Sequence, residues 1–117
     1  MLTITSKSIQ KSPICRITVA NVDLHGLMFD DCDTKIACLF IHGTASNFYQ
    51  NDWIYPLARI LNKNNIAFLS ANNRGSNGFS PYPPHGAALE KMEDSVDDIN
   101  GWISHLKKNG YSKFILL

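Results

Sequence analysis

The segment His42-Gly43-Thr44 is the part of the sequence best suited to chemistry. It follows Leu39-Phe40-Ile41, the end of an apolar run, and it precedes a polar loop. A glycine lets the backbone turn sharply after a strand, so the amide N–H of Thr44 can point into a cleft as a hydrogen-bond donor. We do not expect base catalysis by His42, because a general base also needs a reachable nucleophile and an orienting acid.

Three further residues lie in a long irregular segment and could touch a substrate. Ser80 is the nearest match to an activated serine, in the string Gly78-Phe79-Ser80-Pro81-Tyr82. That string lacks the final glycine of a G-x-S-x-G turn, and proline stands where the turn would be tightest, so we do not expect Ser80 to be a nucleophile. Tyr82 and His85 are candidate substrate contacts. Stiffening by the neighbouring prolines explains Tyr82 equally well, and solvation is the simpler interpretation of His85.

Arg74 and Gly75 form a candidate turn that precedes this segment. An arginine fork in such a turn would more often hold the loop through hydrogen bonds to backbone carbonyls than touch a ligand. We therefore expect a structural role for both residues.

The sequence signals no metal site and no cofactor. The acidic run Asp30-Asp31-Cys32-Asp33 lacks the glycine and the spaced bidentate glutamate of a calcium loop, which favours a solvated turn. The three cysteines, at positions 15, 32 and 38, show no C-x-x-C spacing. They indicate neither a zinc site nor a disulfide framework.

The elements ahead of His42 are expected to be strands. The strand-like runs Cys15–Val19 and Leu24–Phe29 flank Asn21-Val22-Asp23, which has turn chemistry, and together they predict a β-hairpin. The continuous apolar run Ile36–Ile41 fits a strand that is buried on both faces, as in a parallel sheet.

Two helices are expected after His42, each followed by a strand. Asp52 can cap the first helix, whose apolar positions recur at helical spacing: Trp53, Leu57, Ile60 and Leu61. Ile66–Leu69 is the strand that follows, which completes a right-handed βαβ unit. The second helix should run from about Glu93 to Lys108 and end at Asn109-Gly110, with these residues on its apolar face: Val96, Ile99, Trp102, Ile103 and Leu106. The last strand is Phe114–Leu117.

Charge and composition exclude several kinds of partner. The 11 basic and 10 acidic residues are scattered and leave a net charge of +1, which gives no electrostatic footprint for nucleic acid or an anionic membrane. No stretch approaches the roughly 20 apolar residues of a membrane span, and no signal peptide is visible. We expect a cytoplasmic protein with a single domain over residues 1–117, in which residues 1–13 are poorly ordered or variable.

Taken together, these motifs resemble the α/β-hydrolase fold superfamily, which includes serine esterases and lipases. Leu39–Gly43 is similar to its strand and oxyanion loop, and Asn21–Phe29 to its opening hairpin, often written D-G-x-x-L-x-G-x-L-Y. Asn73–Ser80 resembles its D-x-R-G-x-G-x-S turn, with Asn73 in place of the usual acidic residue. Asp94–Lys113 matches the helix that leads into its nucleophile strand. The resemblance rests on the order of these segments along the chain.

The resemblance implies an α/β fold and an activity. The fold would be the N-terminal portion of an α/β-hydrolase sheet, an opening hairpin followed by strand-helix-strand-helix-strand, mostly parallel and truncated before the nucleophile elbow. The intact enzyme would cleave a small-molecule ester or related acyl substrate. This chain would supply the amide of Thr44, supported by His42 and Gly43, but no nucleophile, acid or catalytic histidine. It would then be inactive alone.

A non-catalytic α/β binding or interaction module is the alternative. The loop from Thr44 to Asp52 precedes a helix and could hold an anion through backbone amides. A truncated pseudoenzyme is a related possibility, because Phe114–Leu117 would lie at an uncovered sheet edge and could pair with another chain. Such an edge also predicts poor solubility of the isolated chain. The codons after Leu117 would separate these interpretations.

Overall fold

The chain opens with a hairpin in the computed structural model, which describes residues 13–42, 46–74 and 92–117. Strands β1 (Ile14–Val19) and β2 (Val22–Phe29) pair antiparallel, and Ala20 and Asn21 connect them at φ values of 48° and 66°. Two central residues with positive φ give a turn whose twist matches the flanking strands. The expected turn at Asn21-Val22-Asp23 is therefore wrong. Val22 belongs to β2 and is 2% exposed, because its side chain joins the core.

Three further strands complete a five-stranded sheet in the order β1-β2-β4-β3-β5. Strand β3 (Ile36–Ile41) has the bounds that the sequence predicts, and it pairs in parallel with both β4 (Ala67–Ala71) and β5 (Lys113–Leu116). Strand β2 pairs antiparallel with β4, so β1 and β4 point the same way and only β2 is reversed. Every residue of β4 is buried, as expected for a central strand.

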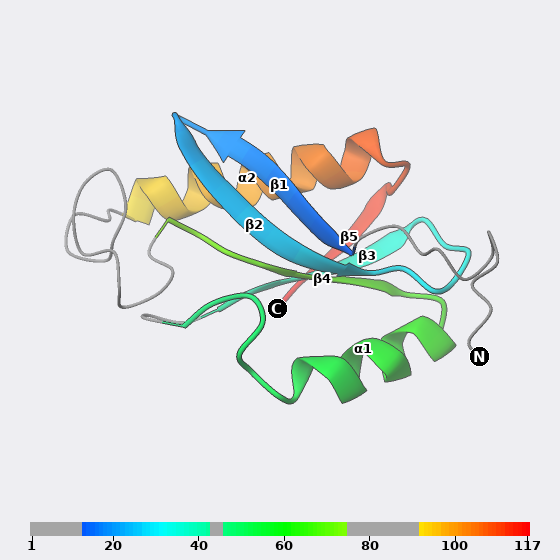
Figure 1. The fold of residues 1–117 in the computed structure, drawn as a ribbon. Helices are drawn as coiled ribbons and strands as arrows, with labels where there is room; N and C mark the ends of the chain where they lie inside the picture. The colour runs from blue at the N-terminus through cyan, green and yellow to red at the C-terminus, as the bar shows by residue number, and fades with distance from the viewer. Residues whose placement is uncertain (1–12, 43–45, 75–91) are drawn as a thin grey trace, which may run out of the picture.

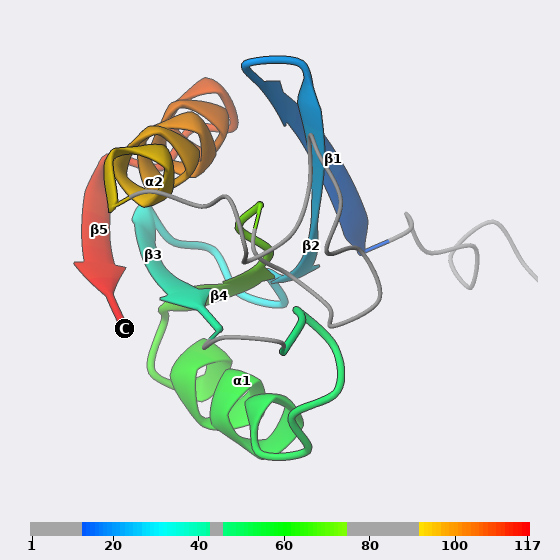
Figure 2. The same cartoon turned by 90° about the vertical axis from the view of Figure 1, so that its left-hand side faces the viewer.

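Helix α1 (Ile54–Lys63) covers one face of the sheet, and helix α2 (Met92–Lys108) covers the other (Figures 1 and 2). Helix α1 begins after Trp53 without a side-chain cap, so the expected cap at Asp52 is wrong. Its buried residues are Ile54 and Ala58, whereas Trp53 and Ile60 are 44% and 58% exposed. The expected apolar face is thus rotated, because the helix meets the sheet along the side that includes small Ala58.

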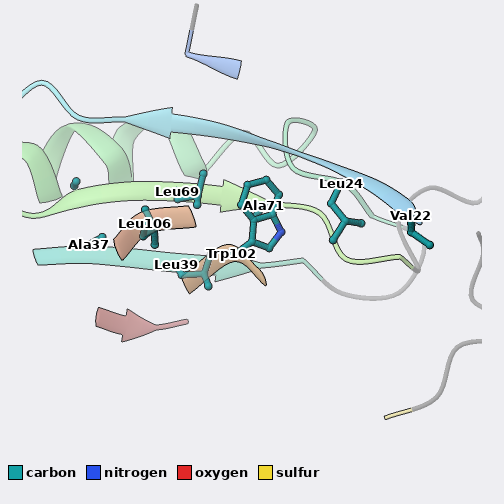
Figure 3. Packing of buried hydrophobic residues seen from close by; sticks show 9 residues of the cluster. Val22, Leu24, Ala37, Leu39, Leu69, Ala71, Trp102 and Leu106 are labelled. Atoms are coloured by element: carbon teal, nitrogen blue, oxygen red, sulfur yellow. The ribbon is translucent and has the colours of Figure 1, made fainter. Parts of the chain in front are cut away.

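Helix α2 supplies the largest core side chain, Trp102. Trp102 and Leu106 pack with residues of β2, β3 and β4, including Leu39 and Leu69 (Figure 3). Val96, expected on this face, is 52% exposed. The helix ends at Lys108, as expected, and Gly110 follows with a φ of 95°, which suits the left-handed residue that follows many helices.

Strand β5 lies at an edge of the described sheet, opposite β1 (Figure 2). Ile115 and Leu116 are 45% and 60% exposed, so the apolar run that ends the sequence is largely solvent-facing in the described structure. Within the described residues, no helix combines the length and apolarity required to cross a bilayer.

Candidate functional site

The carboxyl ends of β3 and β4 bring the candidate loop residues to one edge of the sheet. His42 follows β3 and is 4% exposed, and Asn72 follows β4 and is 6% exposed. Ligands of open α/β sheets gather at this edge, because parallel strands end there together. Gly43, Thr44 and Gly75 lie outside the described residues, as do Ser80, Tyr82 and His85. The structure therefore places His42 and Arg74 of the candidate residues.

The backbone of Phe48 is held at both its polar groups by β4 and its end. Its N–H donates to Oδ1 of Asn72 at 2.9 Å, and its carbonyl accepts from Oγ of Ser70 at 2.6 Å. Ser70 is fully buried, so its hydroxyl needs a protein partner. These two bonds fix the loop between β3 and α1 to β4.

Asn47 stabilises the same loop from within. Its side-chain oxygen accepts from the amides of Tyr49 at 3.0 Å and Gln50 at 2.8 Å, and its amide group donates to the Gln50 side chain at 2.6 Å. An asparagine that bonds to the backbone two and three residues ahead forms a local turn. The fully buried Asn47 thereby shapes the segment that follows residues 43–45.

Arg74 is bound to a buried carboxylate on α2. Its Nη2 and Nε donate to Asp98 Oδ1 at 2.8 and 3.2 Å, and its backbone N–H donates to Oδ2 at 2.9 Å. A second carboxylate, Asp94, lies 3.4 Å from Nη1. Hydrogen bonding to Asp98 raises the pKa of Arg74, so the guanidinium stays charged. Among the described residues the guanidinium contacts carboxylates, and the loop whose backbone carbonyls were expected as partners lies outside the described residues.

Asp98 was missed by the sequence reasoning, although the sequence holds a signal for it. It lies four residues before Trp102, on the helix face that enters the core, and it is 0% exposed. An acidic residue on a buried face requires a cationic or donor partner. The indole of Trp102 donates to the carbonyl of Asn72 at 2.7 Å, so α2 contacts the end of β4 twice.

The described cysteines are poor nucleophiles. Burial raises the pKa of Cys15 to about 11 and raises the pKa values of Cys32 and Cys38 as well. A thiol reacts as its thiolate, which is scarce at neutral pH for such groups. Within the described part of the chain, no cluster of three or more histidine, cysteine or acidic residues could hold a metal ion.

Comparison with known proteins identifies the fold of this chain. The sequence matches no model of a known protein family and no curated protein. Solved structures do match. A cold-adapted esterase from an Arctic intertidal metagenomic library aligns over 98% of this chain and 54% of its own, at a TM-score of 0.70 and 12% identity. The chain has the α/β-hydrolase fold.

Two further esterases match this chain similarly. An esterase from Pyrococcus furiosus aligns over 99% of the chain and 43% of its own, at a TM-score of 0.69 and 18% identity. Est1E from Butyrivibrio proteoclasticus aligns over 90% and 39%, at a TM-score of 0.66 and 16% identity. The chain therefore spans about half or less of the solved esterases, and its elements correspond to the opening half of their fold.

Proposed function

We propose that this chain is the oxyanion side of a serine hydrolase that cleaves a carboxylic ester or a related acyl bond. The amide of Thr44 donates to the oxyanion, and His42 and Gly43 support the turn that carries it. The nucleophilic serine, the acid and the catalytic histidine come from sequence beyond these 117 residues. The activity belongs to the complete fold.

The observation that supports this proposal most is the double hydrogen bond to Phe48. Buried Ser70 and Asn72 hold the loop after β3 against β4 through Phe48. Phe48 lies only four residues after Thr44. An oxyanion donor contributes most when it is held in place before the reaction, because no reorganisation is then needed. The structural neighbours are esterases, which favours an acyl substrate.

The proposal is tested in the intact gene product with a chromogenic ester such as p-nitrophenyl butyrate. Thr44→Pro removes the amide hydrogen, and Thr44→Ala keeps it, so the two variants isolate the backbone donor. We expect T44P to lower kcat by about 10²–10³-fold, the usual effect of losing one oxyanion donor. T44A should keep nearly full activity. Equal kcat values for T44P and the unchanged protein would refute the role of Thr44.

Labelling with a fluorophosphonate identifies the nucleophile. We expect one labelled serine within a G-x-S-x-G segment outside residues 1–117, and no label on Ser80. The isolated 117-residue chain should not be labelled. Labelling of Ser80 would overturn the assignment. A stop codon directly after Leu117, together with no turnover, would favour the non-catalytic binding module.

A further inference from the structure

Asn72 joins three parts of the fold through its backbone and its side chain. Its N–H donates to the carbonyl of His25 on β2 at 2.9 Å, and its carbonyl accepts from the indole of Trp102 on α2 at 2.7 Å. Its side-chain Oδ1 accepts from the N–H of Phe48 at 2.9 Å. Asn72 is also buried, so a displacement at one of these partners is transmitted to the others.

The register of the sheet places Asn72 next to the start of the loop after β3. Ile41 pairs with Ala71 in parallel, so the next residues, His42 and Asn72, leave adjacent strands at the same level. Further along the loop, the N–H of Phe48 bonds to the side chain of Asn72. Asn72 therefore lies beside the residue where the loop begins and binds the backbone where the loop approaches α1.

Helix α2 fixes the end of β4 at two points. Trp102 donates to the carbonyl of Asn72, and the carboxylate of Asp98 accepts from the backbone N–H of Arg74 at 2.9 Å. Asp98 and Trp102 are four residues apart and both fully buried, so they share the face of the helix that enters the core. The two side chains together hold the backbone from Asn72 to Arg74.

The ring of Trp102 is held in one orientation by its surroundings. It lies in the core with Leu39 and Leu69 (Figure 3). A Cβ atom at Gly26 would lie 3.0 Å from Cη2 of Trp102, so the ring packs directly against the backbone of β2. A closely packed ring keeps its N–H pointing in one direction, and this lets Trp102 fix the position of a backbone carbonyl.

We propose that Trp102 and Asn72 are positioning residues for the oxyanion donor. The indole N–H fixes the backbone of Asn72, and Oδ1 of Asn72 holds the N–H of Phe48, so the packing of α2 determines where the loop after β3 lies. This role rests on the proposed function, in which the amide of Thr44 is the donor. A misplaced donor stabilises the transition state less while the substrate still binds, so kcat falls and KM changes little.

Kinetics of the intact gene product with p-nitrophenyl butyrate test the role of Trp102. Trp102→Phe removes the indole N–H and keeps an aromatic ring, and we expect kcat to fall about 10- to 100-fold with KM within about twofold. Leu106→Ala is the matched control, because Leu106 is buried in the same cluster but its side chain has no hydrogen-bonding group. L106A destabilises the core and should leave the kcat of the folded enzyme unchanged. Equal losses of kcat in W102F and L106A would refute the role.

Two variants of Asn72 test the bond to the loop. Asn72→Ala removes the acceptor of the Phe48 N–H and should lower kcat by a similar factor. Asn72→Asp keeps an acceptor oxygen in either protonation state and should recover most of that loss. If N72D loses as much kcat as N72A, the acceptor is not what Asn72 supplies and the assignment is refuted. This pair still decides if W102F does not fold.

Thr44→Pro separates a failure of this role from a failure of the proposed function. If T44P lowers kcat and W102F does not, the role of Trp102 is refuted and that of Thr44 stands. If T44P leaves kcat unchanged, both are refuted. Amide hydrogen exchange gives the structural readout: W102F should speed exchange at Phe48 relative to the amides of β3, and L106A should speed both equally. Unchanged relative exchange at Phe48 in W102F would show that α2 does not position the loop.

Discussion

Two arginines, Arg74 after β4 and Arg16 in β1, have contrasting environments. Arg74 forms ion pairs with two carboxylates, one of them fully buried, and these neutralise its charge within the fold. Arg16 is exposed on β1 and has no ion pair in the described structure. The difference teaches that a buried cation must be neutralised within the fold, whereas an exposed cation is stabilised by water.

The largest expected effect follows from breaking the Arg74 pair. Asp98→Asn leaves the guanidinium against a neutral group in a buried place, and we expect a loss of about 3 kcal/mol or more in the free energy of unfolding. Urea denaturation measures it. Asp97→Asn, an exposed neighbour, should change stability by less than about 0.5 kcal/mol. Arg16→Ala should resemble this control, and a loss as large as that of D98N would end the contrast between the arginines.

Substitution of Gly101 tests the close approach of α2 to β1. Gly101→Ala gains about 1 kcal/mol of helix propensity, but the new methyl group overlaps Val19. Overpacking costs about 1–3 kcal/mol, so we expect a net destabilisation of roughly 1 kcal/mol. The double variant Val19→Ala with Gly101→Ala should be less destabilised than the sum of the single variants. A G101A protein that is more stable than the unchanged protein would contradict this expectation and show that β1 can shift to make room for the methyl group.

The loop clamp at Phe48 should have a smaller and more local effect. Asn72→Ala removes the acceptor of the Phe48 N–H, which costs about 1 kcal/mol. Amide hydrogen exchange should show faster exchange at Phe48, and the amides of β3 serve as the internal reference. Equal loss of protection at both places would indicate a global change instead of a released loop.

The smallest expected effect is a titration shift of His105, in the last turn of α2. Lys108→Ala removes a positive charge beside His105, so the pKa of the imidazole should rise, although burial, the larger cause, still holds it below 6.5. Because the folded-state pKa is lowered, stability from neutral His105 is present above pH 6.5 and is lost as the pH falls through the folded-state value. K108A should reduce this loss. NMR titration of the ring proton measures the pKa, and K107A is the control.

Local sequence patterns predict the bounds of a helix or strand well where a single short segment contains the whole signal. The bounds of β3 and the stop at Gly110 follow from a continuous apolar run and from a residue that accepts positive φ. The predicted buried faces of both helices are less accurate, since Trp53 and Val96 are exposed. Helical spacing fixes which residues share a face, but the sheet decides how that face is rotated toward it.

The sequence by itself determined the order of the elements, the α/β class and the candidate loop after β3, because these depend on neighbouring residues. Only the tertiary structure decided which partners meet. Arg74 binds Asp98, 24 residues away, and Phe48 binds Ser70 and Asn72 of another element. Contacts between distant segments depend on sheet order and helix placement, which no local pattern of residues encodes.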